Sequence, residues 1–153
     1  MNQVDQIVDH AEQQCRSHGA RLTPKRKRVL SGLLQSDRAL SAYELIDIYK
    51  DQYGETMPAM SMYRILDFLR EEHLVHKLSI ANKYVACSHI ARDHDHAASQ
   101  FLICVRCQKV EEIRVSDSVV GQLQSTIEHA GFRLASPQFE IKCICDSCVA
   151  TTA

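Results

Sequence analysis

The sequence predicts an α+β protein in which an N-terminal winged helix-turn-helix domain precedes a small C-terminal α/β domain. Three observations in the 153 residues indicate this fold. The first half shows four stretches of helical periodicity, the middle shows two short alternating segments, and the last third mixes alternating segments with one more helical stripe. Helices followed by a two-stranded hairpin are the pattern of a winged helix.

The first three helices are marked by start and stop signals. Apolar residues at helical spacing fill the first helix, and Gly19 is its expected stop. Thr23 is an N-cap followed by Pro24 at the first helical position, which opens the second helix. Ser41 and Glu44, three residues apart, predict the capping box that opens the third helix.

A fourth helix is expected at residues 60–72, MSMYRILDFLREE. On a helical wheel of about 100° per residue, most apolar side chains occupy one side, which predicts a core face. Tyr63 and Arg64 share the other side with three further polar residues. That side is either an ordinary solvated surface or a surface that presents Tyr63 and Arg64 to a partner.

Two short alternating segments, residues 73–79 and 83–87, complete the winged domain as a hairpin. The histidine-containing stretch that follows has no sustained apolar period and is expected to be a hinge. We therefore divide the chain into a winged domain (1–86), a hinge (87–98) and a second domain (99–153).

The second domain is expected to combine strands with one helix. Strands are expected at FLIC (101–104) and VEEI (110–113), and a helical stripe follows that Gly131 ends. FRL (132–134) and QFEIKCIC (138–145) alternate again, so a last long strand is expected to run into the terminal cysteines.

The composition is that of a globular protein, with 45% hydrophobic and 24% charged residues. No apolar run reaches the roughly 18 residues of a membrane span, and the polar N-terminus is not a secretory signal, so we expect a cytoplasmic protein without membrane contact. A net charge of −1 does not itself indicate nucleic acid. RLTPKRKR (21–28) nevertheless holds five basic residues and no acid, which is typical of either a solvated helix face or a phosphate-contacting cluster.

Seven cysteines in a reducing compartment favour metal or redox chemistry over structural disulfides. Cys15 and Cys143 are expected to be packed core residues. Two Cys-x-x-Cys knuckles can supply four thiolates to one tetrahedral zinc ion. A thiol switch that uses the same sulfurs is the alternative. The four residues are Cys104, Cys107, Cys145 and Cys148.

A second group of potential ligands surrounds the expected hinge. Each member alone is more often structural, but together they form a mixed nitrogen, sulfur and oxygen set that suits Zn²⁺. An ion held by residues of both domains would fix the angle between them. The members are His76, Cys87, His89, His94, His96 and Glu112.

Taken together, these motifs resemble the ferric uptake regulator family. The resemblance rests on RLTPKRKRVL, SAYELID, MYRILDFLREEHLVHK, a C-x-x-C-x-x-V-x-E motif and a closing C-x-x-C, which cover nearly the whole chain. SAYELID, LDFL followed by VHK, and YVAC are most similar to the zinc uptake regulator branch. The hinge reads HDHAAS, without the dense HHHxH pattern usual in the iron branch, and Gln108 stands where the family usually has glycine.

The resemblance implies a homodimeric, zinc-responsive repressor whose C-terminal domain is the dimerisation domain. Its implied partner is double-stranded DNA, at an AT-rich palindromic operator of zinc-uptake genes. An iron- or nickel-responsive or peroxide-sensing regulator of the same family is the alternative. An enzyme is not expected, because the chain has no HExxH, deaminase or nucleophile-elbow motif.

The resemblance also implies roles for individual residues. It assigns two zinc ions to each subunit, with the four knuckle cysteines around the structural ion. The regulatory ion is assigned to His76, Cys87, His96 and Glu112, with His94 as the alternative to His96. The residues expected at DNA are Tyr43, Tyr63, Arg64, Arg21, Lys25, Arg26 and Arg28. Arginine can bond guanine in bidentate fashion, and basic side chains can hold phosphates.

Overall fold

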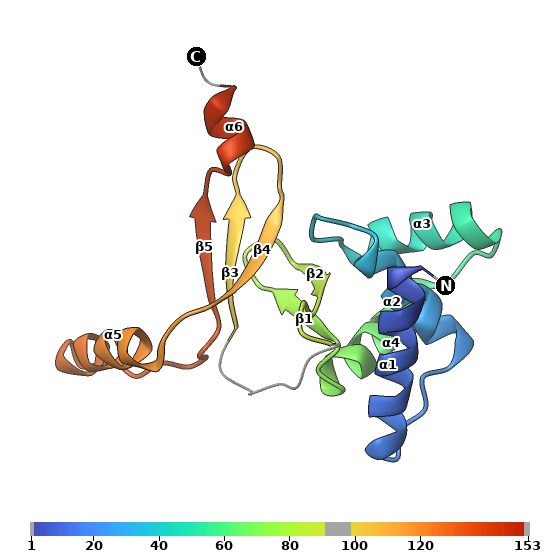
Figure 1. Ribbon diagram of the computed structural model, residues 1–153, viewed down its shortest axis with the longest axis horizontal. Helices are drawn as coiled ribbons and strands as arrows, with labels where there is room; N and C mark the ends of the chain where they lie inside the picture. Colours follow the sequence, from blue (N-terminus) through green and yellow to red (C-terminus); the bar gives the residue numbers. More distant parts are fainter. Residues whose placement is uncertain (1, 91–98, 152–153) are drawn as a thin grey trace. The chain divides into compact units, whose positions relative to one another are not determined.

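The computed structural model in Figure 1 describes residues 2–90 and 99–151. The chain forms two compact units, Met1–His94 and Asp95–Ala153. The boundary between the units falls inside the segment 87–98, for which the sequence predicts a hinge. The hinge role stays a prediction, because most of that segment lies outside the described residues.

The described part of the N-terminal unit has four helices followed by a β-hairpin, as the sequence predicts. Its elements are α1 (Gln3–Ser17), α2 (Pro24–Leu34), α3 (Ala42–Tyr53), α4 (Ala59–Glu71), β1 (Val75–Leu78) and β2 (Lys83–Ala86). The two strands pair antiparallel, and Asn82 takes a φ of 49° in the turn between them. Backbone hydrogen bonds between Leu40 and Tyr84 tie this hairpin to the segment before α3. The arrangement confirms the winged-helix prediction.

The predicted capping box at the start of α3 is present. The Ser41 hydroxyl accepts from the Glu44 N–H at 3.1 Å, and the Glu44 carboxylate accepts from the Ser41 N–H at 3.4 Å. The same carboxylate lies 3.1 Å from the Lys83 ammonium on β2. Glu44 therefore fixes the start of α3 against the wing, and with it the position of the neighbouring Tyr43.

The core of the N-terminal unit is built from one face of each helix. Met62, Leu66 and Leu69 of α4 are fully buried in it, as the helical wheel predicts. Phe68, another apolar residue of this helix, is only partly buried against the core. Cys15 is fully buried in the same core, and burial raises the pKa of its thiol. The prediction that Cys15 is a packed core residue is therefore confirmed.

Gly32, inside α2, offers a test of this packing. A Cβ at this position would meet Leu45 Cδ2 at 3.8 Å and Ile48 Cγ2 at 3.9 Å, which are ordinary van der Waals distances. Because alanine favours a helix over glycine by about 0.5–1 kcal/mol, Gly32→Ala is expected to raise the free energy of unfolding by about that amount. Chemical denaturation followed by circular dichroism measures the change.

Gly54 is the matched control for this substitution. It ends α3 with a φ of 69°, a left-handed conformation that strains any residue with a side chain. Gly54→Ala is therefore expected to lower the free energy of unfolding. A stabilising effect at Gly54, or a destabilising effect at Gly32, would contradict the packing described above.

The described C-terminal unit is a three-stranded sheet with two helices. Its elements are β3 (Ser99–Cys104), β4 (Val110–Arg114), α5 (Asp117–His129), β5 (Phe139–Cys143) and α6 (Asp146–Ala150). The strand order is β4-β3-β5, with β3 antiparallel to β4 and parallel to β5. Figure 1 shows α6 at the carboxyl end of β5 and α5 beyond the opposite end of the sheet. Among the described helices of the whole chain, none combines the length and apolar character that a membrane crossing requires.

The last strand is shorter than the sequence predicts. Residues 132–134 are not a strand, and β5 covers only five residues of the segment 138–145. Gly131 has a φ of 86°, and Pro137 has no N–H to donate to a ladder, so extended pairing begins only after them. Beyond Cys143 the chain enters α6, whose five residues are too few for a helical period to be recognised in the sequence.

Candidate metal and DNA-binding sites

Four cysteine sulfurs come together in the C-terminal unit. All of them lie within 4.8 Å of one another, and they belong to Cys104, Cys107, Cys145 and Cys148. The two knuckles come from opposite ends of the domain sequence. They meet because β3 and β5 run parallel, so that the first knuckle follows β3 and the second follows β5 at the same edge of the sheet.

The register of β5 is fixed at its other end by a buried side chain. Gln100 accepts from the Phe139 N–H at 2.6 Å and donates from Nε2 to the Pro137 carbonyl at 3.0 Å. This places Cys104 opposite Cys143, and the Val105 N–H donates to the Cys143 carbonyl at 2.9 Å. Gln100 was not singled out from the sequence, and only its burial reveals this role.

Local hydrogen bonds hold the knuckles in place. The Cys145 N–H donates to Cys104 Sγ at 3.4 Å, and the Cys107 and Cys145 sulfurs are 3.7 Å apart. Arg106 Nη1 donates to the Cys148 carbonyl at 3.1 Å, which joins the first knuckle to α6. Gln108 has a φ of 66°, which explains why glycine would suit this turn.

The electrostatics of the four sulfurs suit a cation. Hydrogen bonds from the backbone of Cys107 and Cys145 lower the pKa of Cys104 to about 6. Side-chain hydrogen bonding with Cys145 raises the pKa of Cys148 to about 12. One thiolate is therefore favoured while further ionisation is opposed, and a divalent cation removes that opposition because coordinating thiols give up their protons.

Cys143 lies outside the group of four, as expected from the sequence. Its side chain is half-buried on β5 rather than packed in a core, so the prediction of a core residue holds only in part. It is a thiol beside the metal-binding group that is not one of the clustered residues.

A pair of potential metal ligands, His76 and Cys87, lies on the wing. His76 is opposite Val85 on β2, and Cys87 follows two residues after Val85, so both ligands occupy one face of the hairpin. The Cys87 N–H donates to the Leu74 carbonyl at 2.9 Å, which extends the ladder, and the Cys87 side chain is buried. A ring nitrogen of His76 and the Cys87 sulfur lie within 4.8 Å of each other. The N-terminal unit by itself thus presents one nitrogen and one sulfur ligand.

The other predicted members of this group belong to different parts of the chain. Glu112 lies on β4 of the C-terminal unit, where its Oε1 accepts from the Ser99 hydroxyl at 2.5 Å. His89 lies on the N-terminal side with its Nδ1 3.1 Å from the Ser88 hydroxyl. His94 and His96 lie outside the described residues.

The polar face of α4 carries the predicted DNA-contacting residues. Arg64 is exposed and Tyr63 is half-exposed on this face. Tyr43, at the start of α3, is 64% exposed, which is unusual for a large ring and leaves it available to a partner. The α4 face thus combines a half-exposed aromatic side chain with an exposed arginine.

The basic stretch is partly used within the N-terminal unit. The Arg26 guanidinium lies 3.7 Å from the centre of the Phe68 ring and donates to the Arg21 carbonyl at 2.7 Å. Arg28 lies 4.5 Å from the centre of the Tyr53 ring and also donates to the Tyr49 hydroxyl. The exposed members of the predicted set in this stretch are Arg21 and Lys25.

Comparisons with known proteins agree with this geometry. The protein-family model described as "Ferric uptake regulator family" matches residues 17–142 of this chain. The zinc uptake regulation protein of Escherichia coli (strain K12) is 34% identical over 98% of this chain and 85% of its own length. A structure titled "Zinc Uptake Regulator Complexed With Zinc AND DNA" aligns with a TM-score of 0.84 at 31% identity, over 98% of this chain and 97% of that chain. The crystal structure of holo XcZur aligns with a TM-score of 0.78 at 34% identity, over 96% of this chain and 99% of that chain.

Proposed function

The chain belongs to the ferric uptake regulator family, and we propose that it is a zinc-responsive transcriptional repressor of zinc-uptake genes. It acts in the cytoplasm as a homodimer that binds operator DNA when zinc is bound, and it is not an enzyme. The observation that carries this proposal is the presence of two sulfur-containing ligand groups, the four cysteines of the C-terminal unit and the His76–Cys87 pair of the wing. The similarity to zinc uptake regulators along nearly the whole chain supports it.

The four cysteines hold the structural zinc ion in this proposal. Four protein ligands close a tetrahedral site and leave no position for a substrate, which is the arrangement of structural rather than catalytic zinc. The group joins the end of β3 to the end of β5, so the ion cross-links these two strands at one end of the sheet. Its chemical contribution is to hold together two segments about 40 residues apart in the chain.

The regulatory ion is held by residues of both units. We assign His76 and Cys87 from the wing, Glu112 from β4 and a histidine of the hinge segment, His96 or its alternative His94. A thiolate among these ligands favours zinc over iron, which prefers harder nitrogen and oxygen ligands. Two ions per subunit follow from the two groups.

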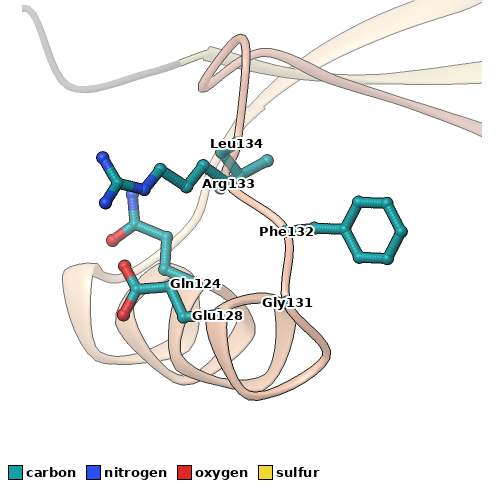
Figure 2. Close-up of a pocket in the computed structure, with 6 residues that line it drawn as sticks. All are labelled: Gln124, Glu128, Gly131, Phe132, Arg133 and Leu134. Atoms are coloured by element: carbon teal, nitrogen blue, oxygen red, sulfur yellow. The ribbon is translucent and has the colours of Figure 1, made fainter.

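The C-terminal unit presents an apolar surface that a second copy of the chain can cover. Within α5, all of which the structure describes, no residue is buried, and Val119 and Leu123 of its apolar stripe are exposed. Figure 2 shows the Phe132 ring pointing away from the side chains of Gln124, Glu128 and Arg133, although all four residues line the pocket beside the end of α5. Phe132 is 70% exposed. Exposed apolar side chains on this scale favour burial in an oligomer.

The regulatory ion would control DNA affinity through the geometry of the dimer. Two reading helices must meet half-sites about 34 Å apart, which is one turn of B-DNA, or a multiple of that spacing. An ion held by both units favours one angle between them and so one spacing of the helices. The ion shifts this equilibrium only by its difference in affinity for the two states, typically about 5–150-fold.

The N-terminal unit would read DNA through α4. Arg64 is placed to bond a guanine edge, with Tyr63 and Tyr43 beside it, and such a bidentate pair is worth about 1–3 kcal/mol of discrimination. Lys25 and Arg21 would hold phosphates. Arg26 and Arg28 are held by aromatic rings of the same unit, so we assign them chiefly to the positioning of α2 against α3 and α4.

The salt dependence of DNA binding separates a phosphate contact from a positioning residue. The slope of log Kobs, the observed association constant, against log salt concentration is negative. Removal of one phosphate contact is expected to reduce the magnitude of this slope by about 0.9. Lys25→Met should therefore weaken binding and reduce the slope. Arg26→Met should weaken binding, because α2 loses its contact with the Phe68 ring of α4, and should leave the slope unchanged. An equal decrease of slope in both variants would place Arg26 directly on the phosphates.

One titration tests the proposed function. Free Zn²⁺ and free Fe²⁺ are varied separately, in metal buffers, while binding to an AT-rich palindromic duplex is followed by fluorescence anisotropy. We expect zinc to promote binding at a lower free concentration than iron, with one tightly held and one exchangeable zinc ion per chain by elemental analysis. Iron acting at the lower concentration would instead support an iron-responsive regulator. Binding independent of both metals would contradict the proposal.

A further inference from the structure

Met60 is an apolar side chain without a place in the core. It lies in the first turn of α4 and is 66% exposed, while Met62 of the same helix is fully buried. Burying a methionine is normally favourable, so an exposed one at the start of a helix contributes nothing to the stability of the unit. The exposed thioether side chain is therefore available to a partner outside the N-terminal unit.

Met60 lies on the same face of α4 as the predicted reading residues. Tyr63 follows three residues later and Arg64 four residues later, which are the spacings that bring helical side chains together. The N-cap of α4 is Pro58, and no side chain caps this end of the helix.

In helix-turn-helix proteins, the N-terminal residues of the reading helix contact base edges in the major groove. Among the groups that bases present there, the C5-methyl of thymine is the apolar one. A thioether side chain donates no hydrogen bond, but its three rotatable bonds let it fit an apolar partner of uncertain position. The chemistry of Met60 thus matches thymine better than any polar base edge.

We propose that Met60 contacts the C5-methyl group of one thymine in each half-site and so determines specificity at that position. This inference rests on the proposed function, because it requires α4 to enter the major groove. It adds an apolar contact to the polar contacts assigned to Arg64 and Tyr63.

The experiment removes the methyl group from the DNA and the thioether from the protein in turn. The probe is an AT-rich palindromic duplex selected from a randomised pool by the zinc-loaded protein. Each thymine pair related by the palindrome is replaced by uracil, which lacks only the methyl group. At one such pair, the replacement is expected to weaken binding of the unmodified protein by about three- to fivefold for each methyl group removed.

Met60→Ala is expected to bind the thymine duplex more weakly and to show no sensitivity to uracil at that pair. Met60→Leu, which keeps an apolar side chain of similar size, should retain the sensitivity. Ile141→Ala, at an exposed apolar residue of β5 in the C-terminal unit, is the matched control and should leave the whole uracil profile unchanged. Circular dichroism checks that the variants are folded.

Two results would overturn the inference alone. One is a Met60→Ala variant that keeps the full uracil penalty, and the other is an unmodified protein that binds every uracil duplex as tightly as the thymine duplex. Failure of the zinc-loaded protein to select or bind any duplex would overturn the proposed function, and this inference with it.

Discussion

Cys145→Ser is expected to remove the tightly held zinc ion and to abolish the fold of the C-terminal unit, and with it dimerisation and DNA binding. Structural zinc sites contribute about 10–16 kcal/mol of binding free energy near neutral pH, as much as the whole stability of an ordinary domain. The C-terminal unit has little else to replace this contribution. Its buried residues among those described are Gln100, Phe101, Ile103 and Cys104.

Zinc content by elemental analysis, circular dichroism and sedimentation velocity measure the three consequences. Cys143→Ser is the matched control, because it removes a thiol from β5 that is not one of the four clustered sulfurs. The control is expected to keep one zinc ion, its secondary structure and the dimer. A Cys145→Ser protein that still holds zinc through dialysis and remains dimeric would contradict the structural role of the group.

Cys87→Ser is expected to leave the fold and the structural zinc ion intact while removing the response of DNA binding to zinc. Cys87 supplies the sulfur of the wing pair, and serine cannot replace a thiolate as a ligand at neutral pH. The zinc-dependent gain in DNA affinity should fall from the range of about 5–150-fold to near unity. Anisotropy titrations in zinc buffers measure it.

The control for this variant is again Cys143→Ser, which should keep the full gain in affinity. Thermal unfolding provides a second control, since Cys87 is buried and its replacement is expected to cost some stability. If Cys87→Ser protein reached the same DNA affinity at the same free zinc concentration as the unmodified protein, the wing pair would not be part of the regulatory site.

Much of the fold follows from local signals in the sequence. Thr23 and Ser41 cap α2 and α3 as predicted, since a capping hydroxyl and the N–H groups it serves are only two or three residues apart. The four knuckle cysteines could be paired from spacing alone, because two Cys-x-x-Cys motifs offer one obvious closed set. Where a motif by itself identifies the residues that interact, the sequence is sufficient.

Other features depend on contacts between distant residues. The last strand ends at Cys143 because α6 begins at Asp146, and the role of Gln100 depends on a strand 39 residues away. The positions of Arg26 and Arg28 on aromatic rings could not be read from RLTPKRKR, where both look like solvated bases. A charged stretch does not reveal which of its members the fold itself uses.

In the proposed function, control of DNA binding depends most on a regulatory zinc ion held by both units, and a measurement of linkage in Glu112→Gln protein tests this proposal directly. In the unmodified protein, operator DNA must tighten the exchangeable zinc by the same factor by which zinc tightens DNA. We predict that Glu112→Gln keeps the structural zinc ion and still binds zinc through His76 and Cys87, but that both factors fall to about one. Equal and undiminished factors in Glu112→Gln protein would contradict an ion shared between the units.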